Sequence, residues 1–524
     1  MTWNPALTAA LTNGGTPLEW VVEVVGALTN SDGSRGGFYL PARYSTSRAG
    51  TSRTTLVGHS VKVGGQSVTP VSWRFNDLSW SFQIADGDRA TAAIVFRRGQ
   101  MLRLLCGLPG MALADYSPIT LGRVVGVRES RPGLMDIECW GPTSALMSRA
   151  TKSRTQLSIH ETYLGSTVAT SGYTAGDATI NVASASSFEF PAARYIMLKV
   201  TPTSGDDAFY LRGTGTGATT VTGLNSGGML GTTAVDAAIG STVVPIWYDQ
   251  GRPDVLTARI LTSSANNTNG AYDDLPFHWG YGLPAKWLDI PDLIDYGTAI
   301  FTPASGSFIS RWWADPAPVN PGSWLSSLLS IHGAWLCTRE GRLTIRGAQD
   351  ITSRGAISKH SGETITDADI IPKSVTVDWY SRDQQTAYAT AGVSSASGSS
   401  TSTPGLTVGS LPFVEDTYNY DLSAYVYENE SNVRQSVLDR SQAWIYSIGE
   451  TINLDCIGLR TARLCPGDVV TLASSLVSGR LARTVLTYAG GVIAMVTSVS
   501  PDWRGGKTSL RLVVLPADRA DSWG

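Results

Sequence analysis

Two pairs of adjacent carboxylates, Asp206-Asp207 and Asp273-Asp274, are the residues of this chain whose types best suit acid–base chemistry. Such chemistry needs both carboxyl groups on one side of a reacting group. Neighbouring residues on a strand point to opposite faces, so a turn would have to bring either pair together. We therefore expect both pairs to shape turns rather than to catalyse a reaction.

The histidines and hydroxyl nucleophiles give no clearer catalytic signal. The sequence has no G-x-S-x-G elbow, no H-E-x-x-H pair and no G-x-x-x-x-G-K-[ST] phosphate loop. The histidines are dispersed, at His59, His160, His278, His332 and His360. We predict no catalytic residue, no cofactor site and no enzymatic activity.

Metal sites and disulfides are not expected either. Asp249, Asp254, Asp273 and Asp274 could offer oxygen ligands to calcium, but their spacing matches no known calcium loop. The cysteines form no C-x-x-C pair and have no histidine at ligand spacing. They are Cys106, Cys139, Cys337, Cys456 and Cys465, and we expect single buried thiols.

Sixteen tryptophans could stack on sugars or bury large areas in cores and interfaces. They include Trp279, Trp287, the pair Trp312-Trp313, Trp324, Trp335, Trp444 and Trp503. Because aromatic residues are enriched at protein interfaces, we favour core and subunit contacts. Sugar binding stays open as the alternative.

Composition limits the partners. At 524 residues the chain exceeds what one core usually supports, so we expect three to five domains. A formal charge of -3 gives no support to a DNA-binding face, and no run approaches the roughly 18 apolar residues that span a bilayer. The charged fraction of 16% is below the usual figure of about 25%, which favours a surface that faces protein. The first residues carry no secretory pattern, so we expect a soluble protein made in the cytoplasm.

The first 150 residues predict an all-β domain. Runs without helical periodicity, bounded by Gly, Pro or Asp, predict strands at 18–25, 79–84, 101–106 and 121–127. The span 29–54 is rich in Ser, Gly and Arg and predicts a long loop.

Residues 165–248 predict an inserted β module. Thr, Ser, Ala and Gly dominate this span, and short strands are expected at 178–182 and 194–200. The glycine-rich tract 213–224 fits a hairpin tip that leads into a strand.

Helical signals are few and come late. Ser323 is a candidate N-cap, and Gly333 would end a helix whose apolar face holds Leu325, Leu328 and Leu329. Residues 335–346 alternate around a glycine turn and predict a hairpin, with Trp335, Cys337, Leu343 and Ile345 on its inner face. A second helix is expected at 432–446, with Val433, Val437 and Trp444 on one side.

Strands close the chain. Pro466-Gly467-Asp468 is a turn in which the proline fixes φ, the glycine permits a positive φ and the aspartate can accept a bond from a nearby N–H group. Strands are expected at 469–472, 493–503 and 508–516. The Ser-rich span 394–410 predicts a flexible loop.

In this order, the elements resemble the tail-tip hub proteins of long-tailed, siphophage-type bacteriophages, which are related to trimeric baseplate hubs. Residues 256–261, followed by 268–276 and 280–284, are similar to a hub linker. Residues 324–346 are similar to a hub helix and hairpin, and the Pro466-Gly467-Asp468 turn with its strands is similar to a terminal hub barrel.

The module at 165–248 is similar to a β module of phage tail proteins, through Thr222-Gly223-Leu224 and the Gly231-Thr232 step. Asn225, Ser226 and Asp236 occupy the region where the familiar form has an arginine and a histidine. No role of those side chains is therefore carried over.

The resemblance implies a mainly β, multidomain chain with two tail-tube-like β-barrels, a small α+β domain and the inserted β module. The implied units are a first barrel at 1–155 (hub domain I), the module at 165–248, a linker at 249–300 (hub domain II), an α+β domain at 301–446 with the loop 394–410, a second barrel at 447–516 (hub domain IV) and a tail at 517–524.

The resemblance also implies a homotrimer whose six barrels form a pseudo-sixfold ring on a sixfold tail tube. Its partners would be the distal tail protein or tube ring, the tape measure protein and a tail or central fibre protein, with DNA only in transit and no membrane insertion. The expected place is the virion tail tip, after assembly in the host cytoplasm. No fibre module follows Pro516, so we expect a separate protein to bind the receptor.

Two functions follow as expectations. The first is a structural hub that connects the tail tube to fibres and forms or gates the channel for genome ejection. The alternative is a carbohydrate-binding or glycan-degrading tail-tip protein whose module at 165–248 contacts sugar.

Overall fold

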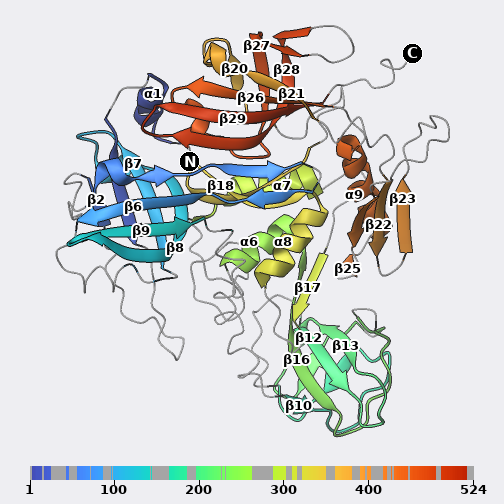
Figure 1. Ribbon diagram of the computed structural model, residues 1–524. Coiled ribbons are helices and arrows are strands. Elements are labelled where there is room, and N and C mark those ends of the chain that lie inside the picture. The colour runs from blue at the N-terminus through green and yellow to red at the C-terminus, as the bar shows by residue number, and fades with distance from the viewer. Residues whose placement is uncertain are drawn as a thin grey trace, which may run out of the picture.

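The computed structural model shows a mainly β protein of several packed units (Figure 1). It describes residues 3–13, 17–24, 43–46, 56–70, 72–85, 96, 98, 100–141, 143, 165–185, 196–225, 227–229, 232–262, 287–301, 310–314, 321–349, 360–380, 390–395, 398–402, 417–421, 426–427, 430–445, 449–479 and 486–515. Among the helices of these residues, none is long and apolar enough to cross a membrane.

The N-terminal sheet has seven strands in the order β2-β1-β7-β8-β9-β6-β3. The strands are β1 (Glu19–Val24), β2 (Arg43–Ser45), β3 (Lys62–Val63), β6 (Ser79–Ala85), β7 (Met101–Gly107), β8 (Ser117–Arg131) and β9 (Leu134–Trp140). Alternate residues of β6, such as Trp80, Phe82 and Ile84, are buried, so the sheet encloses one core. Leu56 N donates to Ser45 O of β2 and Val57 N donates to Gln83 O of β6, so this segment bridges the two sides of the curled sheet.

The C-terminal sheet follows the path β20-β27-β28-β29-β26-β21. The strands are β20 (Thr364–Thr366), β21 (Thr376–Tyr380), β26 (Gly449–Ile457), β27 (Val469–Gly479), β28 (Leu486–Asp502) and β29 (Lys507–Val514). One face holds a core that includes Leu454, Leu472 and Leu512. Val469, Met495 and Val513 on the other face join the core of the central unit, so part of this sheet is buried on both sides.

Six strands of each sheet share one order. The edge strand β2 of the first sheet and the strands β4 and β5 attached to the second have no counterpart and are left out of this comparison. When the remaining strands are numbered along the chain, β1, β3, β6, β7, β8 and β9 in the first and β20, β21, β26, β27, β28 and β29 in the second, both paths read 1-4-5-6-3-2. In both, the fifth strand is the longest, at 15 residues in β8 and 17 in β28, and contains a register shift. The first strand differs, because β1 is antiparallel to β7 whereas β20 is parallel to β27.

A hairpin of the N-terminal part crosses into the C-terminal sheet. It consists of β4 (Gln66–Thr69) and β5 (Arg74–Asn76), which lie in the chain between β3 and β6 of the first sheet. β4 pairs with β28, with Ser67 opposite Ser498. At the crossing, a Cβ on Gly65 would lie 2.7 Å from Val499 O, so the chain can pass there only as glycine.

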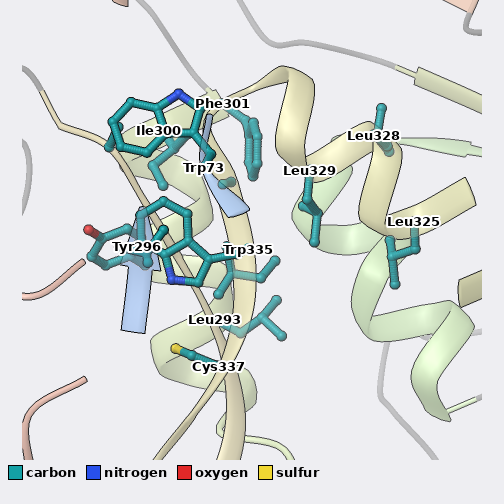
Figure 2. Close-up of a cluster of buried hydrophobic side chains, with 14 of the residues drawn as sticks. Trp73, Leu293, Tyr296, Ile300, Phe301, Leu325, Leu328, Leu329, Trp335 and Cys337 are labelled. Atoms are coloured by element: carbon teal, nitrogen blue, oxygen red, sulfur yellow. The ribbon is translucent and has the colours of Figure 1, made fainter. Parts of the chain in front are cut away.

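The central unit lies between the two sheets (Figure 1). It contains the helices α6 (Pro253–Thr262), α7 (Ile290–Phe301), α8 (Pro321–Ile331) and α9 (Glu430–Ile445), and the hairpin of β18 (Ala334–Arg339) and β19 (Arg342–Gly347). Beside α9 lies a small sheet of β22 (Thr390–Ser395), β23 (Gly398–Ser402) and β24 (Thr417–Asp421). Figure 2 shows the core, in which leucines of α8 face Phe301 of α7 and Trp335 of β18.

The inserted module is a separate β unit with its own core of aliphatic and aromatic residues. Its strands are β10 (Ser166–Thr167), β11 (Thr179–Asn181), β12 (Ile196–Thr201), β13 (Phe209–Gly213), β14 (Gly215–Thr216), β15 (Thr220–Thr222) and β16 (Thr242–Gly251). β16 pairs with β12 in its first half and with β17 (Ser310–Ala314) in its second, and β17 pairs with β25 (Val426–Tyr427). This ribbon carries the module away from the two large sheets (Figure 1).

The predicted strands, both predicted helices and the glycine-centred hairpin are confirmed. The predicted inner face of the hairpin is wrong, because Trp335 and Cys337 pair with Arg346 and Thr344 and lie on the face opposite Leu343 and Ile345. Both faces are largely buried, so alternation alone could not give the register. The first of those helices begins at Pro321, two residues before the expected cap Ser323. Three further helices were not predicted, namely α1 (Pro5–Asn13), α6 and α7, and the last two lie within the range 249–300 that was expected to be a linker (hub domain II).

The Ser-rich range 394–410 was predicted to be a loop, but residues 398–402 form β23 and pair with β22. Strand pairing uses the backbone, so small polar residues can form an edge strand when a neighbour supplies the packing, here α9. Within the range 29–54, also expected to be a loop, residues 43–45 form β2, and most of that range lies outside the described residues. The C-terminal sheet takes β20, β21 and β4 from outside 447–516, while the division into domains stays a prediction.

Removing the indole ring of Trp73, at the tip of the β4–β5 hairpin, should destabilise the folded chain. Trp73 is buried, and its φ of 50° is one that a non-glycine residue holds only when packing enforces it. We expect Trp73→Ala to lower the free energy of unfolding by about 3–5 kcal/mol. Calorimetric unfolding checks this, with the half-exposed Trp140→Ala as the control; equal effects of the two substitutions would contradict it.

Candidate functional site

A buried arginine joins the central unit to the C-terminal sheet. Arg346, near the end of β19, has 2% of its side chain exposed. Its Nε donates to Asp468 Oδ1 at 2.7 Å and its Nη1 donates to Asp292 Oδ2 at 2.7 Å. The guanidinium also lies 4.5 Å from the centre of the Tyr296 ring. One side chain therefore links β19, helix α7 and the turn before β27; we call this cluster the arginine junction.

The turn Pro466-Gly467-Asp468 is shaped to receive that arginine. Gly467 has φ of 100°, and a Cβ on it would lie 2.6 Å from Arg346 Cβ. Asp468 Oδ2 accepts a bond from Cys465 N at 2.9 Å, which confirms the expected use of this aspartate. Trp335 Nε1 donates to Pro466 O at 3.1 Å. The turn is therefore held by contacts with the β18–β19 hairpin.

Tyr296 of helix α7 also belongs to the arginine junction. Its hydroxyl donates to Gly467 O at 2.9 Å, and Gln349 Nε2 donates to the hydroxyl at 2.8 Å. Burial raises the pKa of Tyr296 above its ordinary value, so the phenol stays neutral and keeps its donor proton. This bond attaches helix α7 directly to the backbone of the turn.

The charges of the junction stabilise one another. Burial by itself would raise the pKa of Asp292, but Arg346, Arg339 and the Thr344 hydroxyl lower it below the ordinary value. Burial would likewise lower the pKa of Arg346, and the neighbouring acidic groups Cys465, Asp468 and Asp292 raise it well above the ordinary value. The Asp292 carboxylate and the Arg346 guanidinium are therefore both charged at neutral pH.

A polar cavity of about 280 Å³ opens beside the junction. It is lined by Asp292, Tyr296, Arg339, Arg346, His360, Ser361, Asp468 and Val469. The two guanidinium groups face two carboxylates, with Arg339 Nη1 3.2 Å from Asp292 Oδ1. The lining is thus balanced in charge, as expected of a joint between units rather than of a site for a strongly charged ligand.

The β4–β5 hairpin enters the same region from the N-terminal part. Trp73 stacks on Trp335 with ring centres 5.9 Å apart (Figure 2). Its ring also meets Trp444 edge-on, with ring centres 5.2 Å apart. Gln66 exchanges two hydrogen bonds with the Thr338 backbone, at 2.9 and 3.1 Å. These contacts fix the N-terminal hairpin to β18.

The two large sheets also touch directly. Trp503, in the turn between β28 and β29, lies 5.3 Å from Trp20 of β1 and 6.2 Å from Trp3. Leu459 N donates to Leu11 O of α1 at 2.8 Å. The relative placement of the sheets is therefore set by a shared hairpin and by contacts between them.

The structure does not bring the predicted candidate residues together. Asp206 and Asp207 are exposed, and Asp206 Oδ2 accepts a bond from Ser204 at 2.6 Å. Asp254 is buried and paired with Arg252 at 2.7 Å. His332 packs edge-on against Phe301, whereas His360 bonds to Thr471. Outside the described parts lie His160, His278, Trp279, Asp273, Asp274 and the side chains of His59, Asp249, Trp312, Trp313 and Trp324.

Within the described residues, no group of three or more His, Cys, Asp or Glu side chains is placed to hold a metal ion. The predictions of no catalytic, cofactor or metal residue stay predictions. Of the named tryptophans, Trp287, Trp335 and Trp444 are buried, as expected for core contacts.

Sequence reasoning missed Asp292, Tyr296 and Arg346. The predicted alternation placed Arg346 on the face opposite Trp335, where a charged side chain would be exposed to solvent. In the structure Arg346 pairs directly with Trp335, so the two side chains lie on one face of the hairpin. That face is buried because α7 and the Pro466-Gly467-Asp468 turn cover it, and both come from distant parts of the chain. Of the junction, only the Pro466-Gly467-Asp468 turn could be predicted from the sequence.

Neither a protein-family model nor a curated protein matches the chain. Solved structures similar to it include tail proteins. The tail protein from Neisseria meningitidis MC58 has 9% identity and a TM-score of 0.37, over 95% of this chain and 96% of that one. The 43 kDa tail protein of prophage MuSo2 from Shewanella oneidensis has 10% identity and a TM-score of 0.36, over 95% and 98%.

The prophage tail protein gp18 from Listeria monocytogenes EGD-e has 8% identity and a TM-score of 0.37, over 94% of both chains. TM-scores below 0.5 do not establish a common fold, and identities this low transfer no function.

Removal of the junction's arginine should cost far more than removal of a surface arginine. Arg346→Ala removes the 2.7 Å ion pairs of buried Asp292 and Asp468 and leaves them only the longer contacts with Arg339, so we expect a loss of about 3–5 kcal/mol in the free energy of unfolding. Arg128→Ala breaks an ion pair whose arginine is 82% exposed, and should cost less than about 1 kcal/mol. Denaturant unfolding of both variants checks this.

Neutralising the more buried carboxylate provides the control. Arg346→Ala combined with Asp468→Asn should recover part of the loss, because Asp468 is then uncharged while Asp292 keeps its ion pair with Arg339 at 3.2 Å. An Arg346→Ala variant as stable as Arg128→Ala would contradict the structural role of the junction.

Proposed function

We propose that this chain is a structural hub at the distal end of a bacteriophage tail, acting as a homotrimer. In this role it joins the tail tube or its distal tail protein to fibres, and it surrounds the passage for the tape measure protein and the genome. The observation that carries the proposal is the strand order 1-4-5-6-3-2, found in both large sheets.

The repeated sheet matters because of symmetry. A threefold cap can match a sixfold tube only if each subunit offers two similar faces. A chain with two sheets of one strand order meets that condition, since three copies supply six similar sheets. The direct contact of Trp503 with Trp20 and the shared β4–β5 hairpin keep those two faces at a fixed mutual position.

The charge and composition of the chain fit a conduit more than a binding surface. A formal charge of -3 gives no electrostatic basis for holding DNA, so nucleic acid would pass without being retained. The low charged fraction of 16% suits a surface covered by other tail proteins.

The inserted module would face outward in this arrangement. The β16–β17 ribbon carries it away from both large sheets (Figure 1). We propose that it contacts fibres or other tail components while the sheets build the ring.

The oligomeric state tests the proposal. We expect native mass spectrometry of the purified chain, or of the assembled tail tip, to give a species of three 55.6 kDa subunits. The physical reason is that two tube-like sheets per chain close a ring of six with three copies. A monomer in both preparations would contradict the hub.

An insert-free variant makes the test sharper. Thr167 pairs with Thr242, so the two ends of the module are adjacent, and a short Gly-Ser linker can replace residues 168–241. The trimer should persist in this variant, because the sheets form the ring. If this variant folds but no longer forms the trimer, the module and not the sheets would be responsible for assembly. Glycan cleavage by the purified full chain in a zymogram would favour the alternative function, a glycan-degrading tail-tip protein.

A further inference from the structure

Two cysteines far apart in the sequence meet at the arginine junction. The sulfur atoms of Cys337 on β18 and Cys465 before the Pro466-Gly467-Asp468 turn lie 3.6 Å apart, although 128 positions separate them in the chain. Both side chains are fully buried, and both are free thiols. Figure 2 shows Cys337 on the same strand as Trp335.

We propose that Cys337 and Cys465 form a dithiol site that a peroxide oxidises to a disulfide, which locks the β18–β19 hairpin to the C-terminal sheet. The site does not depend on the proposed hub function. It depends on the closeness of two thiols at a joint between two units of the chain.

The surroundings favour the pairing of these two sulfurs. The S–S bond is about 2.05 Å long, so the sulfurs have to approach by about 1.5 Å, within the reach of side-chain rotation. The backbones on either side are already fixed to each other, by the bond from Trp335 Nε1 to Pro466 O at 3.1 Å and the bond from Arg346 to Asp468 at 2.7 Å. Oxidation would thus add a covalent link to segments that need little movement.

The other cysteines lie elsewhere. Cys106 and Cys139 belong to the core of the N-terminal sheet, and Cys456 belongs to the core of the C-terminal sheet. Burial raises the pKa of the Cys456 thiol to about 12. These three thiols act as internal controls in the same molecule.

The chemistry is balanced with hydrogen peroxide as the oxidant. The Cys465 thiolate attacks one peroxide oxygen, the O–O bond breaks, and a sulfenic acid and one water result after proton transfer. The sulfur of Cys337 then attacks the sulfenic sulfur, forms the S–S bond and releases a second water. Two thiols and one peroxide thereby give one disulfide and two waters.

Access and protonation limit the rate of this reaction. Burial, the contact with Cys337 and the nearby Asp468 carboxylate all raise the pKa of the Cys465 thiol well above its ordinary value. Neither sulfur lines the polar cavity of about 280 Å³, but Asp468 does, and its Oδ2 lies 3.5 Å from Cys465 Sγ. The disulfide therefore forms slowly in the closed junction and faster whenever the junction opens.

The test uses the full chain and hydrogen peroxide as the probe. After oxidation and non-reducing proteolysis, mass spectrometry should find a cross-linked peptide joining Cys337 to Cys465, two hydrogens lighter than the sum of its parts. The midpoint of thermal unfolding should rise by about 2–4 °C, because the link closes a loop of more than 100 residues in a long chain. Dithiothreitol should reverse both changes.

Variants separate this link from general oxidation. Cys337→Ala and Cys465→Ala should each abolish the cross-link and the rise in the midpoint, whereas Cys456→Ala should keep both. The proposal is overturned if the wild-type chain shows no such peptide while its thiols are consumed, or if Cys337→Ala keeps the rise. Even if a variant fails to fold, the presence or absence of the Cys337–Cys465 peptide in the oxidised wild-type chain tests the proposal.

Discussion

The hairpin from Gln66 to Asn76 is the constraint on which the rest of this structure depends. The chain that forms it leaves the N-terminal sheet after β3 and returns to that sheet at β6. In between, β4 pairs with β28 of the C-terminal sheet, and Trp73 enters the aromatic core between Trp335 and Trp444. One hairpin therefore contacts all three units, and none of them can shift without breaking strand pairing or exposing a buried tryptophan.

The arginine junction fixes the C-terminal sheet to the central unit. Arg346 holds the Pro466-Gly467-Asp468 turn against the β18–β19 hairpin and helix α7 through two short ion pairs. Buried ion pairs add little net stability over apolar packing, but they are costly to break and demand one geometry. The junction thus specifies the position of the C-terminal sheet, much as the β4–β5 hairpin specifies that of the N-terminal sheet. A rigid pair of similar sheets is what the proposed hub requires.

Much of the local structure could be predicted from the sequence because it depends on near neighbours. Alternation in Ser79–Ile84 gave a strand whose buried face is the predicted one. Around Gly341 the hairpin was predicted correctly, but its register was not, and its two predicted inner pairs lie on opposite faces. Leu325, Leu328 and Leu329 gave a helix with the predicted buried face. Helices α6 and α7 were missed, although Pro253 and Asp254 at the start of α6 are helix-start signals.

The junction and the shared hairpin could not be predicted, because both depend on contacts over more than 100 residues. Arg346 meets Asp468 across 122 positions, and Gln66 meets Thr338 across 272. No periodicity connects such residues, and a short strand such as Gln66–Thr69 gives no sign of the sheet it will join. The two similar sheets were expected only from the resemblance, and the common strand order is a property of the structure.

A cryo-electron microscopy reconstruction of the assembled oligomer tests the central claim most directly. The account predicts six sheets of strand order 1-4-5-6-3-2 around one channel, with N-terminal and C-terminal sheets alternating about a threefold axis and the β4–β5 hairpin spanning each pair within a chain. A map with only one kind of sheet around the channel, or with both sheets away from it, would contradict the account.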